Sequence, residues 1–423
     1  MQSFQKIPDW VKLEHQVAHL LTQQEIHGWF FDVNAARELE STLRKELWEI
    51  EDVLRARFPT VAGPVFTPKR DNRTQGYVKG ASFTKLKDLN IRSRDHIAWI
   101  LTQHTGWKPT SLTTTGKPII DEVVLKEINS PIALQFLRIL MITKTLGMIS
   151  EGANAWLKLV TNANRIHHHC SVGTITHRCS HRSPNLSQVP SDLAYRALFT
   201  ASPGNIMCGA DLSGIELRLL AHYLGAYDNG RYADILLNGD IHQVNADKIG
   251  ISRKQVKTVT YAFLYGAGSE KIGHSYDPQL SSDKAKKKGR EIADAYVKAI
   301  PGLDKLLKAV KAKGESGAIN AIDGRKIIVG SPHKSLNCLL QASATVVAKR
   351  WMLITHDLIR EVGIKATQLA FIHDELQFET TPTHEQDLRT SLVSASLLAG
   401  EHYGLRIRID AEAKSGRTWA DVH

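Results

Sequence analysis

The stretch CGADLSGIELRLLAHYL, residues 208–224, reads as an apolar strand that runs directly into an amphipathic helix. We expect the strand over 205–211 and the helix from about 215 through Glu216 to Tyr223. Asp211 would then stand at the end of a strand, a rigid place to hold a ligand oxygen. An aspartate there is also a common cap or turn residue, so this stretch does not decide the function alone.

A second acidic segment, LAFIHDELQFE at residues 369–379, predicts two apolar strands joined by a tight turn at His373, Asp374 and Glu375. Asp211 and Asp374 are far apart in the sequence and can meet only through folding. If they meet, they supply the hard oxygen ligands that Mg²⁺ prefers. Two such ions, about 3.5–4 Å apart, can serve both ends of a phosphoryl transfer.

The third segment, SRKQVKTVTYAFLYGAG at residues 252–268, places large side chains at every fourth position: Arg253, Lys257, Tyr261 and Tyr265. On a helix each such step advances about 40°, so the four form one slowly drifting stripe. An arginine and a lysine one turn apart can hold a triphosphate, and a tyrosine ring offers a stacking surface for a base. A helix with solvated cations and half-buried tyrosines is the competing interpretation.

Size and composition set the class of protein. The chain has 423 residues, a formal net charge of +11 and four scattered cysteines, Cys170, Cys179, Cys208 and Cys338. This length predicts two or three subdomains, and the positive charge favours a polyanionic partner. The sequence contains no run of 18 apolar residues and begins without an apolar signal segment. We therefore expect reduced thiols, no membrane association and a cytoplasmic location.

Helical periodicity covers residues 10–57, as one long helix or a helical hairpin, and returns near Asp95 and over 121–162. Residues 59–93, rich in Gly, Pro, Lys and Arg, read as a loop with short elements. Short β-like stretches follow over 165–190. Residues from about 215 to Gly314 are largely helical, and the final part is mixed.

In this order the three segments resemble the polymerase domain of family A DNA polymerases, especially those of short-tailed bacteriophages. Supporting stretches are GWKPTSLTTTGKP from Gly106, SPNLSQVP from Ser183, NGDIH from Asn238 and LNCLLQASA from Leu336. The resemblance implies an α+β, right-hand polymerase fold with a helical thumb, an antiparallel-sheet palm and helical fingers. The implied boundaries are 1–164 for the thumb with a basic tip at 59–93, 165–228 and 319–423 for the palm, and 229–318 for the fingers.

The resemblance also implies roles for individual residues. Asp211 and Asp374 would bind two Mg²⁺ ions, with Mn²⁺ able to substitute and the Leu212 carbonyl as a further ligand, and Glu375 would be an accessory carboxylate. Arg253, Lys257 and His242 would bind the triphosphate, with Lys257 as general acid. Residues placed around the nucleotide and the primer end are Glu216, Tyr261, Tyr265, Arg178, Gln188, Gln341 and His373.

Within that set, Glu216 would exclude a 2′-hydroxyl and so select deoxynucleotides. Tyr261 would pack on the nascent base pair, and a tyrosine at this position implies tolerance of dideoxynucleotides. Arg178, Gln188, Gln341 and His373 would contact the minor groove. The expected partners are primer-template DNA, dNTPs, and in the replication complex a helicase-primase and a single-strand-binding protein.

Departures from the family pattern also matter. His177 replaces the glycine usual before Arg178, which puts the local backbone geometry in question. The run HHHCSVGTITHRCSH, 167–181, lacks common zinc-finger spacings, so we do not expect zinc there. No Asp-x-Glu pair precedes the thumb pattern, so we expect no proofreading in this chain and any exonuclease in a separate subunit. Residues 59–93 are short for a thioredoxin-recruiting loop, which leaves a thioredoxin partner open.

Two other functions fit parts of the pattern. A phage-type single-subunit RNA polymerase shares the hand and the metal aspartates, but Glu216 and the HDE triplet argue against it. A non-catalytic DNA-binding replication subunit would not need the ligand and phosphate positions that this chain retains.

Overall fold

The computed structural model describes residues 7–277 and 280–423. The chain forms two compact units, one of Asn34–Leu157 (the smaller unit) and one of Met1–Val33 with Lys158–His423 (the larger unit). Residues 1–6 of the predicted thumb and 278–279 of the predicted fingers lie outside the described residues. The first helix belongs to the larger unit, whereas the sequence-based thumb begins at residue 1.

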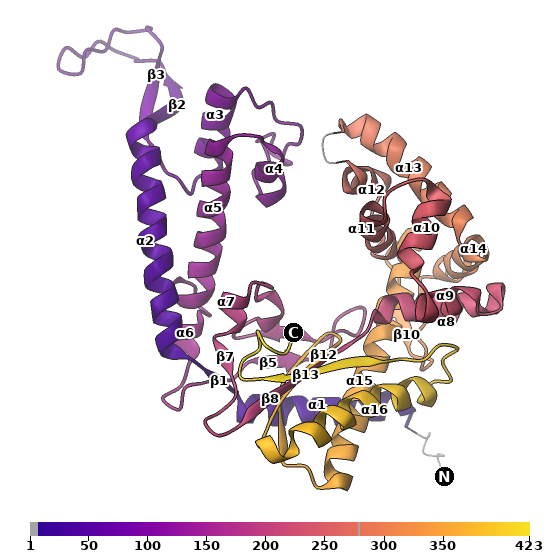
Figure 1. Cartoon of the computed structure of the whole chain (residues 1–423). Helices are drawn as coiled ribbons and strands as arrows, with labels where there is room; N and C mark the ends of the chain where they lie inside the picture. The colour runs from indigo at the N-terminus through magenta and orange to yellow at the C-terminus, as the bar shows by residue number, and fades with distance from the viewer. Residues whose placement is uncertain (1–6, 278–279) are drawn as a thin grey trace, which may run out of the picture. The chain divides into compact units, whose positions relative to one another are not determined.

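The smaller unit is mostly helical (Figure 1). Its elements are α2 (Val33–Arg57), β2 (Thr60–Phe66), β3 (Phe83–Asp88), α3 (Arg94–Thr105), α4 (Glu122–Glu127), α5 (Pro131–Leu146), the π-helix η1 (Gly147–Glu151) and α6 (Trp156–Leu159). Leu43, Leu47 and Leu54 of α2 are buried at helical spacing. Arg138 of α5 donates to both carboxylate oxygens of Glu46 in α2, at 2.5 and 2.7 Å.

The short elements expected in the basic stretch 59–93 include an antiparallel pair of strands, β2 and β3. Every residue of β3 is exposed, so burial does not hold it in place. Phe66, Tyr77 and Phe83 pack edge to face or tilted at 5.4–5.7 Å, and the Lys85 ammonium lies 4.1 Å from the Phe66 ring centre. These ring contacts organise the hairpin and leave its cations in solvent.

One helical segment, Pro131–Leu159, has the length and apolar composition of a membrane span, and half of the tested window is buried. A core helix passes the same test. Ile132, Phe136, Ile139 and Ile142 of this segment are buried in the smaller unit, as in a core helix.

The larger unit is organised around an antiparallel sheet in the order β11 (Ala366–Ile372), β12 (Glu375–Thr380), β8 (Ile206–Leu212) and β13 (Ala411–Gly416). The helices α15 (Ser335–Val362), α16 (Glu385–His402) and α1 (Asp9–His27) pack with these strands (Figure 1). All six residues of β12 are buried, because it is a central strand covered on both faces. The strands predicted over 205–211 and near 369–379 are therefore confirmed, the first with its bounds one residue later.

Three smaller sheets complete the β-structure: β1 (Trp29–Phe31) with β4 (Arg165–Ile166) and β7 (Phe199–Thr200), β5 (His169–Ser171) with β6 (Ser180–Arg182), and β9 (Ala318–Asn320) with β10 (Lys326–Ile328). Short helical turns are η2 (Leu186–Gln188), α7 (Leu193–Arg196), η3 (Pro332–Lys334) and η4 (Pro382–His384). Gly28, with φ of 70°, separates α1 from β1, so the periodic stretch 10–57 is two helices rather than one.

A run of helices lies between the first and last parts of the central sheet. It comprises α8 (Ile215–Asp228), α9 (Arg231–Asn238), α10 (Ile241–Ile249), α11 (Arg253–Leu264), α12 (Ser269–Tyr276), α13 (Ser282–Ala299) and α14 (Leu303–Gly314). The pair α12 and α13 packs through glycines. A Cβ on Gly273 would lie 2.0 Å from the Ala285 carbonyl oxygen, so only glycine permits this approach. All four cysteines are free and buried, as expected.

Candidate active site

Strand register brings the two aspartates together. Asp211 is the penultimate residue of β8 and pairs with Glu375, the first residue of β12. Asp374 precedes Glu375 in the tight turn between β11 and β12, and the Leu212 amide donates to the Asp374 carbonyl at 3.0 Å. The adjacency predicted from the sequence is therefore present in the fold.

Both carboxyl groups are difficult to ionise in the absence of a cation. Removal from water, followed by the charge of Glu375, raises the pKa of Asp211 to about 6, although part of its side chain still reaches solvent. Burial, then Asp211 and Glu216, raises the pKa of Asp374 to about 7. Two carboxylates that repel each other form a site that a bound cation would stabilise.

Glu375 has a different environment. It is buried, and its Oε1 accepts from Trp419 Nε1 at 2.5 Å and Gln377 Nε2 at 2.7 Å, with His423 Nδ1 3.4 Å from Oε2. Burial alone would raise the pKa of Glu375, but these partners lower it. The C-terminal residues Trp419 and His423 thus hold Glu375 in place, a role with no local sequence signal.

Glu216, in the first turn of α8, is the centre of a polar cluster beside the aspartates. Arg178 Nη2 donates to its Oε1 at 2.9 Å, and the Tyr265 hydroxyl donates to the same oxygen at 3.2 Å. The side chain of Glu216 is 11% exposed and that of Arg178 is 24% exposed. Burial followed by Glu216 raises the pKa of Tyr265 to about 12, so the hydroxyl stays protonated. The cluster fixes the position of the Glu216 carboxylate.

Three of the four predicted stripe residues, Arg253, Lys257 and Tyr261, lie on α11, and Tyr265 is the residue that follows the helix. A capping box between Ser252 and Gln255 starts this helix, and its buried residues are Val256, Val259, Thr260 and Leu264. Arg253 and Lys257 are exposed and Tyr261 is half-buried. The helix ends at Leu264, two residues before Gly266, whose φ is 70°.

A group of cations gathers at the start of α10 and α11. Arg253 Nε donates to Asp240 Oδ2 at 2.7 Å, and Asp240 also caps α10 through the His242 and Gln243 amides. Burial, and after it the charges of Arg253 and Lys257, lowers the pKa of His242 against the opposing effect of Asp240. Sequence reasoning missed Asp240 as the partner of Arg253, although the NGDIH stretch contains it.

The four residues expected at the minor groove are placed unevenly. His373 has a φ of 61° in the β11–β12 turn, and burial and then the Arg178 charge lower its pKa, so these two lie near each other. Gln188 is exposed in η2 and Gln341 is half-buried on α15. No hydrogen bond within residues 7–277 and 280–423 links either glutamine side chain to the carboxylates.

His177 adopts a φ of 60°, the left-handed region that glycine favours. The substitution of glycine by histidine therefore leaves the backbone turn in place, and Arg178 still reaches Glu216.

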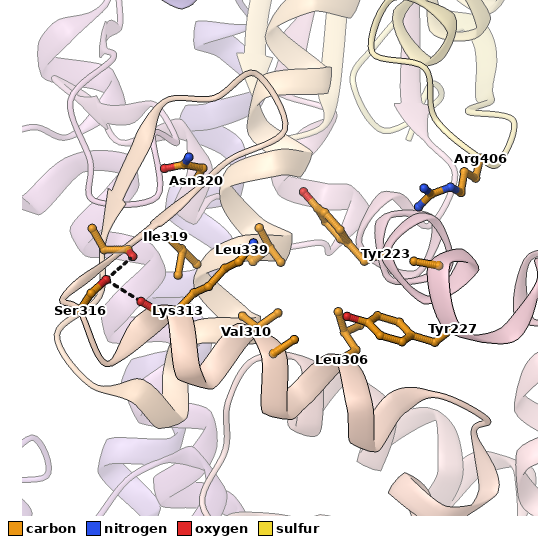
Figure 2. Close-up of a pocket in the computed structure, with 13 residues that line it drawn as sticks. Tyr223, Tyr227, Leu306, Val310, Lys313, Ser316, Ile319, Asn320, Leu339 and Arg406 are labelled. Atoms are coloured by element: carbon orange, nitrogen blue, oxygen red, sulfur yellow. Dashed lines mark hydrogen bonds between the residues drawn. The ribbon is translucent and has the colours of Figure 1, made fainter.

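A pocket of about 400 Å³ lies elsewhere in the larger unit, between α8, α14 and β9. Figure 2 shows Tyr223 and Tyr227 on one side and Val310 and Lys313 on the other. None of the predicted site residues lines it, so this pocket is separate from the carboxylates.

Comparison with known proteins decides the family. The sequence profile of DNA polymerase family A matches residues 70–421. The chain belongs to this family. The polymerase is 31% identical to the DNA-directed DNA polymerase of Enterobacteria phage T3 and 32% identical to that of Escherichia phage T7. Each match covers 98% of this chain and 70% of the phage protein.

More distant relatives agree. The polymerase is 24% identical to DNA polymerase I of Pseudomonas aeruginosa over 80% of this chain and 39% of that protein. A solved structure described as the POL domain of Pol1 from M. smegmatis in complex with DNA primer-template and dNTP is similar, with a TM-score of 0.78 and 20% identity. The match covers 97% of this chain and 70% of the M. smegmatis chain. The predicted right-hand fold is therefore confirmed.

Family membership and the phage relatives give the activity: this enzyme is a DNA-directed DNA polymerase that carries out template-directed synthesis with divalent metal ions. The RNA polymerase alternative has no support among these relatives, which are DNA polymerases.

Proposed function

We propose that Asp211 and Asp374 are the ligands of two Mg²⁺ ions during primer extension, with the Leu212 carbonyl as a further ligand. The observation that carries this proposal is the juxtaposition of two carboxyl groups whose pKa values are raised to about 6 and about 7. Oxygen donors of this kind fit Mg²⁺, and Mn²⁺ can substitute. The ions would lower the pKa of the primer 3′-hydroxyl and neutralise the departing pyrophosphate.

The residues of the chain would then position the reactants. Arg253, Lys257 and His242 bind the triphosphate of the incoming dNTP. Arg253 must exchange Asp240 for phosphate, which costs little because both side chains of this ion pair are exposed and screened by water. The primer 3′-hydroxyl gives its proton to water as its oxygen bonds the α-phosphorus, and the bond from that phosphorus to the oxygen bridging the α- and β-phosphates breaks. Lys257 donates a proton to the leaving pyrophosphate.

Sugar selection is assigned to Glu216. Its carboxylate is held by Arg178 and Tyr265, so it cannot swing aside to admit a 2′-hydroxyl. Tyr261 lies near Glu216 and Asp374, since both charges raise its pKa after the effect of burial. It would pack on the nascent base pair, with Glu375 an accessory carboxylate held by Trp419.

DNA contacts follow from the same assignment. Arg178, Gln188, Gln341 and His373 would touch the minor groove near the primer end, where acceptors are common to all base pairs. The basic β2–β3 hairpin of the smaller unit would hold duplex phosphates. The thumb would be residues 1–164, the palm 165–228 with 319–423, and the fingers 229–318. The phage relatives favour a role in phage DNA replication in the host cytoplasm, beside a helicase-primase and a single-strand-binding protein.

Primer extension tests the proposal. Asp211→Asn and Asp374→Asn should each lower Mg²⁺-dependent single-nucleotide addition by at least about 10³-fold. Both variants should bind primer-template DNA with wild-type affinity in a gel-shift assay. Substantial synthesis by either variant would overturn the assignment of the metal ligands.

A further inference from the structure

The β5–β6 hairpin carries three potential metal ligands on one face. Cys170 and His181 are directly opposed in the antiparallel register. Opposed residues share a face. His168 is the residue before β5, and its ligand atom lies within 4.8 Å of those of Cys170 and His181. The other face carries His169, which lies 2.8 Å from a Glu25 carboxylate oxygen. Strand alternation therefore separates the inward ligands from the outward histidines.

The three inward side chains converge in the interior. His168 is 0% exposed, His181 7% and Cys170 8%. Cys170 Sγ lies 3.2 Å from His181 Nδ1, and one ligand atom from each residue lies within 4.8 Å of the others. A tetrahedral zinc site separates sulfur and nitrogen ligands by about 3.3–3.6 Å, so closure needs a shift of about 1 Å.

The side chain of Gln24, 1% exposed on α1, lies against two of the three residues. Its Nε2 is 3.1 Å from His168 Nε2 and 3.6 Å from Cys170 Sγ. Its Oε1 accepts from Gln368, whose Oε1 in turn lies 2.8 Å from His356 Nε2. Turning both amides over keeps the bonds that link Gln24, Gln368 and His356, gives up the 3.3 Å bond from Gln368 Nε2 to Met352 Sδ, and places the Gln24 oxygen beside His168 and Cys170.

Each of the two buried imidazoles has one nitrogen inside this group, His168 Nε2 beside Gln24 and His181 Nδ1 beside Cys170 Sγ. His168 Nδ1 and His181 Nε2 have no hydrogen-bond partner within the described part of the chain. Both rings are removed from water, which disfavours the protonated form. A neutral imidazole is the form that coordinates metals.

We propose that His168, Cys170 and His181, with the Gln24 side-chain oxygen, bind a structural Zn²⁺ or a similar thiophilic cation. Binding forms the metal–sulfur bond and releases the Cys170 proton to solvent. One thiolate and two imidazoles select zinc-type ions over Mg²⁺. The spacing of these residues matches no common zinc finger, which is why the sequence argued against zinc. Here it is the hairpin register, together with α1, that assembles the ligands.

The position of this site suggests what the metal would support. His181 packs against His373 at 6.0 Å between ring centres, and His373 precedes Asp374. The same hairpin carries Arg178, the partner of Glu216. A bound ion would therefore fix α1 and the hairpin behind the active site without touching substrate.

Metal analysis of the full-length protein tests the proposal. Protein loaded with Zn²⁺, then exchanged into excess Mg²⁺ to clear the carboxylates, should retain one equivalent of zinc. Protein loaded with Co²⁺ should show the near-ultraviolet absorption of a thiolate–cobalt bond. Cys170→Ala should abolish that absorption and weaken zinc binding by more than about 100-fold, the upper effect of losing an outer-shell partner.

The matched control is Cys179→Ala, because Cys179 is equally buried on the same hairpin region but is not among the converging ligands. It should bind zinc as the wild type does. X-ray absorption at the zinc edge of the wild type, independent of any variant's folding, should give one sulfur and two imidazole nitrogens. Absence of the cobalt–thiolate absorption, its persistence in Cys170→Ala, or a sulfur-free zinc shell would overturn the proposal.

Discussion

Removal of the Glu216 carboxylate should relax sugar selection. In Glu216→Ala the space beside the nucleotide sugar is opened, and Arg178 and Tyr265 lose their shared acceptor. A pocket difference of one small group is worth about 1–3 kcal/mol, so discrimination between a dNTP and the matching rNTP should fall about 10–200-fold. Arg178 and Tyr265 each lose a hydrogen bond to the Glu216 carboxylate, and such a bond is worth at most about 1.5–3 kcal/mol. The loss is smaller here because Arg178 keeps partial access to water.

Single-nucleotide insertion opposite one template base measures this effect as the ratio of kcat/KM for dNTP over rNTP. Tyr265→Phe is the matched control, since it removes one of the two bonds to Glu216 and leaves the carboxylate and the Arg178 pair. Its ratio should stay within about fivefold of the wild type, equivalent to about 1 kcal/mol. A wild-type ratio in Glu216→Ala, or an equal loss in Tyr265→Phe, would refute steric selection by Glu216.

Three further outcomes are expected. Tyr261→Phe should reject dideoxynucleotides more strongly than the wild type in chain-termination assays. The reason is that the hydroxyl of Tyr261 can replace the missing 3′-hydroxyl of the nucleotide as a hydrogen-bonding group. Equal rejection by both enzymes would contradict this. Burial alone would raise the pKa of Glu379, but bonds from His27 and Ser202 lower it to about 2. Glu379→Gln should therefore lower the free energy of unfolding by on the order of 3 kcal/mol at pH 7, measured by urea unfolding. The difference between wild type and variant should shrink as pH falls from about 4.5 towards 2. A difference that does not change with pH would argue against an ionised Glu379. His177→Gly should leave the melting temperature nearly unchanged, because the relief of about 1 kcal/mol of left-handed strain is offset by the greater entropy of glycine in the unfolded chain. His177→Val should lower the melting temperature clearly. The reverse order would contradict a role of residue 177 in the backbone turn.

Local patterns predicted the elements whose burial has a regular period. The α11 stripe follows directly from four-residue spacing, and the β11–β12 turn follows from two apolar runs around Asp374. Each motif had a common structural alternative, and only their combination favoured catalysis. The family profile and the phage relatives then confirmed polymerase membership.

Long-range contacts could not be predicted in this way. The sequence gives no local sign that α1 packs with the larger unit, or that Trp419 donates to Glu375 from the far end of the chain. The ion pair of Arg253 with Asp240 and the convergence of the buried hairpin ligands likewise depend on register and packing between segments. Such contacts are set by the tertiary fold rather than by spacing.

Metal stoichiometry tests the central claim most directly. With primer-template DNA and a non-hydrolysable dNTP analogue, Mn²⁺ titration followed by electron paramagnetic resonance should show two tightly bound ions that Mg²⁺ displaces. Asp374→Asn should weaken Mn²⁺ binding by at least about tenfold with DNA affinity unchanged. Two ions bound with wild-type affinity in this variant would contradict the assignment of Asp211 and Asp374 as the metal-binding centre.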